Sequence, residues 1–348
     1  MLSTLAPPPE RTLTTLFQRF GAGEPLACRP LTEGLLNRGY RVVTTRGRFF
    51  LKHHLDGDPE AVVPLARRHG ITTALAALGL PVVPPVADRE GRTVAVLGRG
   101  GSYALYPWVE GRHRGGGELT PDECRRLGAL LGRVHRGLEH VITGAEDRAA
   151  GVRCAEAADA ASTRELIEIL LARIRLRSRR TGFDELAEHR LLERRELLLR
   201  HAHRRPHRAQ MPASGWVHGD FHPLNLLYRR EGPAEPVAII DWDRLGIRPR
   251  AEEAVRAAAI FFLRPDGSLD LTRVRAYARA YRQATGAPGD ELSAAVHRVW
   301  WERLNDFWML RWHYELRDTR ADPQFPAAAA LIVWWTRYAA AVRSAFCD

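Results

Sequence analysis

Two stretches decide the fold of this chain: His218-Gly-Asp-Phe-His-Pro-Leu-Asn225 and, shortly after it, Ala238-Ile-Ile-Asp241-Trp-Asp243. The first follows the strand-like residues Gly215-Trp-Val217 and runs into Leu226-Leu-Tyr228. The second ends the apolar run Val237-Ala-Ile-Ile240, which is typical of a buried strand. The pattern therefore predicts a polar loop between two short strands, followed by a strand that ends in a carboxylate.

Three side chains of these stretches point to a common chemistry. The carboxylate of Asp220, the amide of Asn225 and the carboxylate of Asp241 are expected at a shared end of the two strands. Such oxygen ligands suit Mg²⁺, which binds one or two protein carboxylates together with substrate phosphates. One carboxylate then stays free to orient a hydroxyl nucleophile.

The order His218-Gly-Asp-x-x-x-x-Asn225, then Ile240-Asp-Trp242, resembles the aminoglycoside phosphotransferase / choline kinase family. That family is similar to protein kinases, with His-Gly-Asp in place of His-Arg-Asp and Ile-Asp in place of Asp-Phe-Gly. The resemblance covers most of residues 25–265. It implies an α+β, two-lobed protein-kinase-like fold, with a small antiparallel sheet lobe and a larger, mainly helical lobe. It also implies transfer of the γ-phosphoryl group of ATP to a hydroxyl of a small molecule.

The resemblance assigns roles to four residues of this chain. Asp220 matches the catalytic aspartate, Asn225 and Asp241 match the Mg²⁺ ligands, and Lys52 matches the lysine that contacts the nucleotide phosphates. Lysine and arginine together number 52, and Lys52 is the only lysine among them. A composition that uses arginine at every other basic position has kept an ammonium here, and a guanidinium is not an equivalent phosphate ligand.

Three further residues are expected at the nucleotide. Phe50 lies two positions before Lys52, on the same strand face, and is expected either against the adenine or in the core. The backbone carbonyl of Pro107 and the backbone N–H of Val109 match the hinge that meets the adenine edge. The turn over the nucleotide corresponds to residues 30–40, which are poor in glycine.

The sequence departs from the family pattern at two places. The helix after the lysine strand normally supplies a glutamate partner, but Arg68 or His69 aligns best there, and Glu60 is the only acid available. Lys52 is then paired differently or held by phosphates alone. Glu253 stands where the family has an aspartate that braces the catalytic loop.

Composition excludes several other functions. The 348 residues are 45% hydrophobic and 27% charged, which is typical of a globular chain long enough for more than one domain. Cys28, Cys124, Cys154 and Cys347 form no Cys-x-x-Cys pair, so neither a disulfide framework nor a zinc site is expected. No signal pattern and no apolar run of about 18 residues occurs. We therefore expect a cytoplasmic protein without a membrane partner.

The predicted organisation is a nucleotide-binding lobe (1–106), a hinge (107–117) and a helical lobe (118–348). The last contains the catalytic loop 218–225, the metal strand 237–243 and the substrate-binding helices. Strands are predicted at 41–45, 49–51, 93–97 and 103–106, and helices at 59–78, 119–139, 154–179, 183–204, 251–263, 270–285, 289–315 and 326–346.

The sequence says less about the identity of the acceptor substrate. Trp301, Asn305, Trp308 and Trp312 recur at helical spacing, with Glu302 and Asp306 on an adjacent face. This stripe is either an aromatic and acidic wall for a cationic alcohol or, as we favour, core packing. The acceptor class therefore stays open between aminoglycoside-like, choline-like and other amino or sugar alcohols.

Two other classes of function compete with a small-molecule kinase. One is a kinase-like binding protein without turnover, which the missing helix glutamate favours. The other is a nucleic-acid-associated protein, which rests only on the formal net charge of +11. The arginine-rich run 173–180 is better interpreted as a solvated helix face, and no nucleic-acid partner is expected. The helix expected directly after Arg244–Pro249 leaves no room for the activation segment of a protein kinase.

Overall fold

The computed structural model describes residues 6–31, 37–55, 62–97, 101–143, 156–208, 211–232 and 234–348. The chain divides into two compact units. Unit 1 comprises Met1–His113, Gly137–Thr143 and Leu224–Leu245, and unit 2 comprises Arg114–Arg136, Gly144–Pro223 and Gly246–Asp348. The strand pair that follows the loop 218–225 thus belongs to the same unit as Lys52.

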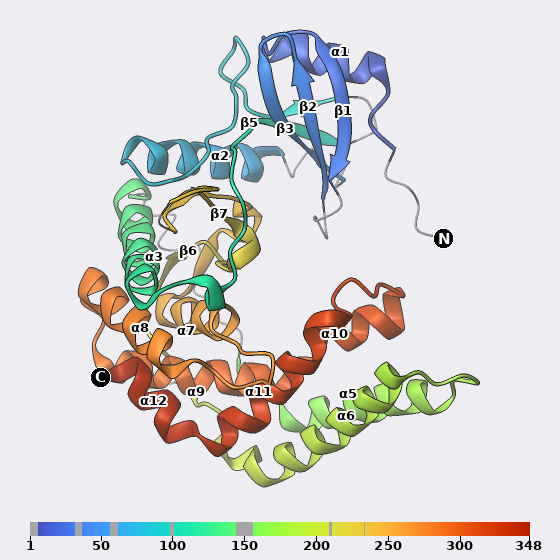
Figure 1. Cartoon of the computed structure of the whole chain (residues 1–348), viewed down its shortest axis with the longest axis vertical. Coiled ribbons are helices and arrows are strands. Elements are labelled where there is room, and N and C mark those ends of the chain that lie inside the picture. Colours follow the sequence, from blue (N-terminus) through green and yellow to red (C-terminus); the bar gives the residue numbers. More distant parts are fainter. Residues whose placement is uncertain are drawn as a thin grey trace. The chain divides into compact units, whose positions relative to one another are not determined.

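Unit 1 is built on an antiparallel five-stranded sheet of order β1-β2-β3-β5-β4 (Figure 1). Its strands are β1 (Pro25–Leu31), β2 (Arg38–Thr44), β3 (Gly47–His54), β4 (Ala95–Val96) and β5 (Ser102–Pro107). The predicted hairpin is confirmed, because β2 and β3 pair across a tight turn that ends at Thr44↔Gly47. A small antiparallel sheet beside mostly helical structure confirms the α+β class.

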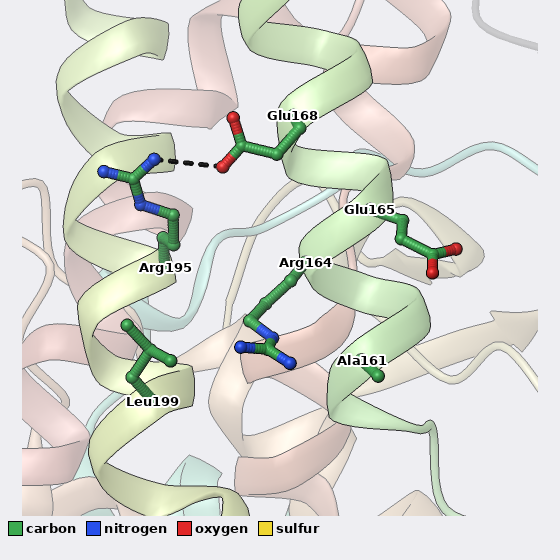
Figure 2. Close-up of a pocket in the computed structure, with 6 residues that line it drawn as sticks. All are labelled: Ala161, Arg164, Glu165, Glu168, Arg195 and Leu199. Atoms are coloured by element: carbon green, nitrogen blue, oxygen red, sulfur yellow. Dashed lines mark hydrogen bonds and ion pairs between the residues drawn. The ribbon is translucent and has the colours of Figure 1, made fainter.

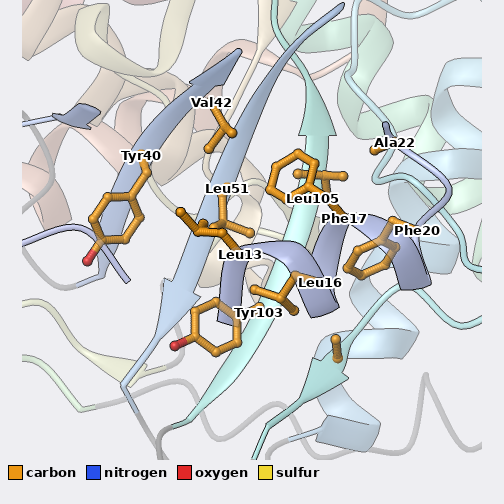
Figure 3. Packing of buried hydrophobic residues seen from close by; sticks show 11 residues of the cluster. Leu13, Leu16, Phe17, Phe20, Ala22, Tyr40, Val42, Leu51, Tyr103 and Leu105 are labelled. Atoms are coloured by element: carbon orange, nitrogen blue, oxygen red, sulfur yellow. The ribbon is translucent and has the colours of Figure 1, made fainter. Parts of the chain in front are cut away.

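One face of this sheet carries the apolar core of unit 1. The helix α1 (Glu10–Arg19) turns Leu13, Leu16 and Phe17 towards Leu51 and Leu105 of the sheet (Figure 3). The spacing i, i+3, i+4 places the three α1 residues on one stripe. No helix was predicted at these residues, although the apolar stripe is the pattern that indicates one.

The opposite face of β3 carries aromatic and basic side chains. Because successive strand residues alternate between faces, Phe50, Lys52 and His54 lie opposite the buried Leu51. Phe50 is in register with Tyr106 of β5. The helix α2 (Val62–Ala77) agrees with the predicted helix where the chain is described; residues 56–61 lie outside the described part.

A second strand pair completes unit 1. The strands β7 (Leu226–Tyr228) and β8 (Pro236–Ile239) are antiparallel, and the Trp242 indole Nε1 donates a hydrogen bond to the Ile239 carbonyl at 3.1 Å. Trp242 is buried. These contacts fix the path of the chain on both sides of Asp241.

Unit 2 is mainly helical. Its principal helices are α3 (Pro121–Val141, whose last residues belong to unit 1), α5 (Ala160–Arg175), α6 (Gly182–His201), α7 (Arg250–Phe261), α8 (Leu271–Thr285), α9 (Gly289–Asn305), α10 (Trp308–Arg311), α11 (Phe325–Arg337) and α12 (Ala339–Cys347). α7 packs on α9, α12 on α8 and α9, and α5 on α6 (Figure 1). The strands β6 (Ser214–Val217) and β9 (Gly246–Pro249) pair antiparallel, and α7 follows β9 directly, as expected.

The predicted helix 289–315 is wrong, because α9 ends at Asn305. The buried guanidinium of Arg194 binds the last carbonyls of α9, those of Arg303 and Leu304. Asp306 Oδ1 then accepts a hydrogen bond from the Trp308 amide at 3.0 Å, which begins α10.

The stripe of Trp301, Asn305, Trp308 and Trp312 therefore does not lie on one continuous helix. Trp308 and Trp312 follow the end of α9 and contact each other edge to face, with ring centroids 5.2 Å apart. Trp301 is 1% exposed, and its indole donates to the Ala158 carbonyl. Asn305 accepts a hydrogen bond from Thr163 of α5. Core packing, the favoured interpretation, describes Trp301.

The predicted helix 326–346 is two helices, α11 and α12, which meet at a 90° bend. Within the described residues, no single helix is both long and apolar enough to cross a membrane; only the stretch Asp322–Arg337 taken together with Ala339–Cys347 passes that test. Cys28, Cys124 and Cys347 are free thiols, and Cys154 lies outside the described residues.

Candidate active site

The centre of the site in unit 1 is the ammonium group of Lys52. Lys52 Nζ lies 2.8 Å from Asp241 Oδ1 and 2.8 Å from Asp243 Oδ2. The lysine is 8% exposed, whereas the side chains of Asp241 and Asp243 are 46% and 30% exposed. The structure thus brings together two predicted site residues, Lys52 and Asp241, which are 189 positions apart in the sequence.

The backbone at Asp241 is unusual. Asp241 has φ 60° and ψ 66°, a left-handed conformation that residues other than glycine seldom adopt, and such residues cluster at functional sites. A short 3₁₀ turn, Trp242–Arg244, follows it. With Trp242 buried between them, both aspartates reach Lys52.

Asn225 lies beside this pair. Its backbone carbonyl accepts a hydrogen bond from the Ile240 amide at 2.9 Å, next to Asp241, and its side chain is buried. The two predicted metal ligands are therefore carried by adjacent segments of unit 1.

The charge of Lys52 is strongly stabilised. Burial alone lowers the pKa of the Lys52 ammonium, but the carboxylates of Asp241 and Asp243 outweigh burial and raise it above its ordinary value. Burial, with Lys52 close by, lowers the pKa values of His54 and His69 to about 4. Both imidazoles are thus neutral at pH 7.

His69 is one of the two residues, with Arg68, that aligned with the helix glutamate. Its Nε2 lies 3.0 Å from the Tyr106 hydroxyl and its Nδ1 lies 2.8 Å from Thr93 Oγ1. His69 therefore binds Tyr106 and Thr93. Within the described residues Lys52 pairs with Asp241 and Asp243, and Glu60 lies outside the described part of the chain.

The predicted adenine contacts lie at one end of the sheet. The rings of Phe50 and Tyr106 are 6.1 Å apart, and the Phe50 ring occupies the space that a Cβ on Gly39 would need. Pro107 ends β5 and is followed by Trp108 and Val109, where the Trp108 amide donates to the Arg48 carbonyl. The roles of Phe50, Pro107 and Val109 at a nucleotide stay predictions.

In unit 2, the loop that carries Asp220 is tightly braced. Gly219 has φ 87°, which favours glycine between His218 and Asp220. The buried His218 accepts a hydrogen bond from the Asp220 amide at its Nδ1, at 3.2 Å. His222 Nε2 lies 3.5 Å from Asp220 Oδ2. His218 thus holds the loop, and the Asp220 carboxylate is partly exposed.

Glu253 is the acid that braces this loop, as its alignment predicted. Its carboxylate accepts hydrogen bonds from the His218 amide at 3.2 Å and from the Gly219 amide. His135 Nε2 donates to it at 2.7 Å, and His135 Nδ1 lies 3.1 Å from the Tyr281 hydroxyl. Burial raises the pKa of the Glu253 carboxyl, but these donors outweigh burial and keep the pKa below its ordinary value.

Two residues of this cluster, Asp243 and Asn37, were not assigned to the site from the sequence. Asp243 was named without a role, and Asn37, whose Nδ2 donates to Asp243 Oδ2 at 2.6 Å, was given none. The spacing of Asp241 and Asp243 was the signal for the first. Nothing in the local sequence marks Asn37, because its partner is 206 positions away.

A groove of about 320 Å³ lies elsewhere in unit 2, between α5 and α6 (Figure 2). Ion pairing between Arg195 and Glu168 at 3.0 Å crosses it. The other residues that line it are Ala161, Arg164, Glu165 and Leu199. None of the predicted site residues lines this groove.

Known proteins resemble this chain along most of its length. Residues 27–287 match the model of the phosphotransferase enzyme family. A homoserine kinase of Nitrobacter hamburgensis is 26% identical over 302 residues, which are 85% of this chain and 84% of the relative.

Solved structures of similar fold include a spectinomycin phosphotransferase in complex with ADP and spectinomycin. It has a TM-score of 0.64 and 14% identity, and the match covers 94% of both chains. A microcompartment-associated aminopropanol kinase has a TM-score of 0.56 and 18% identity, over 96% of this chain and 99% of the other. These likenesses confirm the kinase-like fold that the motifs implied. Since the family model spans most of the sequence, the chain belongs to the phosphotransferase enzyme family and is a small-molecule kinase.

Proposed function

We propose that this protein transfers the γ-phosphoryl group of ATP to the hydroxyl of a small amino alcohol. The observation that carries the proposal is the contact between Lys52 and Asp241, which joins the only lysine of the chain to the predicted metal-binding carboxylate. A buried lysine beside exposed carboxylates is suited to bind phosphate oxygens as a point charge.

The chain's own residues divide the work. Lys52 Nζ donates to the α- and β-phosphate oxygens, while Phe50 and the backbone groups of Pro107 and Val109 receive the adenine. The carboxylate of Asp220 accepts the proton of the acceptor hydroxyl and orients its oxygen towards the γ-phosphorus. The new P–O bond forms as the bond to the leaving ADP breaks. Positioning and charge neutralisation supply most of the acceleration.

The residues present fit Mg²⁺. Asn225 and Asp241 offer an amide oxygen and a carboxylate from adjacent segments, and few protein ligands suffice because Mg²⁺ keeps waters and substrate phosphates in its shell. Bound there, Mg²⁺ neutralises charge on the phosphates. Asn225 and Asp241 would hold it.

Homoserine is the first acceptor to test. The relative from N. hamburgensis, matched over most of both lengths, bears the name homoserine kinase. The solved structures of similar fold are named for other acceptors, spectinomycin and aminopropanol. All three names denote molecules with both an amine and a hydroxyl, which supports an amino alcohol as the class.

The test is phosphoryl transfer from ATP with Mg²⁺, followed by ³¹P NMR and mass spectrometry of the product. The panel contains homoserine, aminopropanol, choline, ethanolamine, spectinomycin and other aminoglycosides. The Asp220→Asn variant serves as the blank. We expect one acceptor to give a phosphorylated product with the wild type and none with the variant. A protein that binds MgATP yet phosphorylates no member of a wide panel would instead be the kinase-like binding protein.

A further inference from the structure

The helix that follows the lysine strand offers Lys52 no acid in its described part. Residues Val62–Ala77 of α2 contain neither Asp nor Glu. The buried positions of α2 are Leu65, His69, Thr72 and Leu75, and His69 is bonded to Thr93 and Tyr106. The inward face of α2 is therefore committed to apolar packing and to the sheet.

Lys52 instead has two carboxylate partners that differ in how they are held. Asp241 is nearly half exposed and stands next to the Asn225 segment, where a metal ligand is needed. Asp243 is less exposed and is fixed from its other side by Asn37 Nδ2 at 2.6 Å. Asn37 precedes β2, and in that strand Gly39 is the register partner of Lys52. Asp243 is thus tied to the sheet at two neighbouring points.

In an active enzyme, Asp241 and Asp243 cannot be equally strong ion-pair partners of Lys52. A metal ion held by Asp241 would compete with Lys52 for the carboxylate oxygens and would weaken that ion pair. Asp243 keeps its contact with both Lys52 and Asn37. An ammonium on a flexible four-carbon stem needs such a fixed partner to stay aimed at a phosphate.

We propose that Asp243, fixed by Asn37, is the positioning residue that orients Lys52 for catalysis, in the place of a helix carboxylate. This inference rests on the proposed function, because it assumes that Lys52 binds nucleotide phosphate. It assigns Asp243 to the lysine and not to the metal.

The single lysine makes a direct test possible. In full-length protein grown with ¹³Cε-lysine, the only labelled side chain is Lys52. We expect Asp243→Asn to shift or broaden the Lys52 signal, both in the free protein and with saturating MgADP, and Asn37→Ala to do so in the same direction. The control is Glu90→Gln, which removes a carboxylate of unit 1 that pairs with Arg92 and should leave the signal in place.

A double-mutant cycle adds an independent readout. Asp243→Asn should lower kcat about tenfold or more in the wild-type background, yet less than about twofold in Lys52→Ala, because residues that act through one another are not additive. The Mg²⁺ concentration for half-maximal binding of ADP should change less than about threefold, as expected when no metal ligand is removed.

An unmoved Lys52 signal, or equal losses of kcat in both backgrounds, would overturn the proposal. So would a tenfold higher Mg²⁺ requirement, which would make Asp243 a metal ligand. The spectra of the free protein decide whether Asp243 holds Lys52 even if no acceptor is ever phosphorylated. Failure to bind MgADP, by contrast, would contradict the proposed function itself.

Discussion

Single residues decide the chemistry of this protein, and Asp220 is the first of them. It sits on a loop whose backbone is held by His218 and Glu253, so the carboxylate can be changed without unfolding its support. We expect Asp220→Asn to lower kcat about 10³-fold, within the range typical of a lost general base, and to leave the Kd for MgATP within about threefold. Transfer assays and calorimetric titration measure the two quantities.

Asp318→Asn provides a matched control for this change. Asp318 pairs with Arg320 and is not among the predicted site residues. The control should transfer phosphate at the wild-type rate. Equal loss of MgATP binding and of activity in Asp220→Asn would contradict the assignment of Asp220 to the acceptor.

The second residue-scale prediction concerns Lys52→Arg. The variant keeps the positive charge but replaces a compact ammonium by a planar guanidinium, between two carboxylates that lie 2.8 Å from Nζ. We expect kcat/KM to fall about tenfold or more with the fold retained, as seen in circular dichroism. A fully active variant would show that charge alone is required and would remove Lys52 from a specific phosphate contact.

At the scale of elements, one buried network joins α3, α7 and the catalytic loop. Glu253 of α7 accepts hydrogen bonds from His135 of α3 and from two loop amides. Glu253→Gln replaces one carboxylate oxygen with an NH₂ donor, at a position where the surrounding groups are themselves donors. We expect Glu253→Gln to lower the free energy of unfolding by about 3 kcal/mol, because several buried donors lose a charged acceptor. Urea denaturation measures this change.

The exposed Glu196→Gln on α6 is the comparison for that variant, and it should change stability by no more than about 0.5 kcal/mol. If Glu253→Gln is as stable as the wild type, then the loop does not depend on Glu253. The same network gives the buried His135 an acid partner that lies 118 positions away in the sequence.

At the scale of the whole molecule, acid stability depends on a buried carboxylate outside the site. Asp88 is fully buried, and hydrogen bonds from the Arg92 amide and from the guanidinium groups of Arg19 and Arg92 surround it. Burial raises the pKa of Asp88, but these donors outweigh burial and lower it to about 2.

A lowered folded-state pKa stabilises the fold at pH values above the ordinary value of 3.8, where the carboxylate is ionised in both states. This contribution is lost as the pH falls from about 4 through about 2. We expect Asp88→Asn to be less stable than the wild type at pH 6, and the difference in Tm to shrink towards zero at pH 2. A difference that stays constant over this range would contradict the ion-pair explanation.

Ion pairs also balance much of the positive charge of the arginine-rich run 173–180. In the arginine-rich run 173–180, Arg173, Arg175, Arg177 and Arg180 pair with Glu315, Glu188, Asp184 and Glu188 respectively. Such neutralised arginines support the interpretation of this run as a solvated surface, but only its first residues lie on a helix, because α5 ends at Arg175. These four arginines of the run face three carboxylates, so the run itself carries less unpaired positive charge than its sequence suggests.

The sequence by itself determined the residue types of the site and their local setting. His218–Asn225, Asp241 and Lys52 each stand in a loop, a turn or a strand whose pattern depends on near neighbours, so the motif and the α+β class could be recognised from the chain alone. The hairpin β2–β3 and most helices followed for the same reason, since period and turn residues act within a few positions.

Only the tertiary structure decided which side chains pair with one another. Lys52 and Asn37 both bind Asp243, and Arg194 binds a backbone carbonyl near the end of α9. These contacts join segments that are far apart in the chain. No local pattern encodes such pairings, because the free energy of a buried charge depends on which groups the fold brings within hydrogen-bond distance. The missing helix glutamate could thus be noticed in the sequence, but its replacement could be identified only in the folded chain.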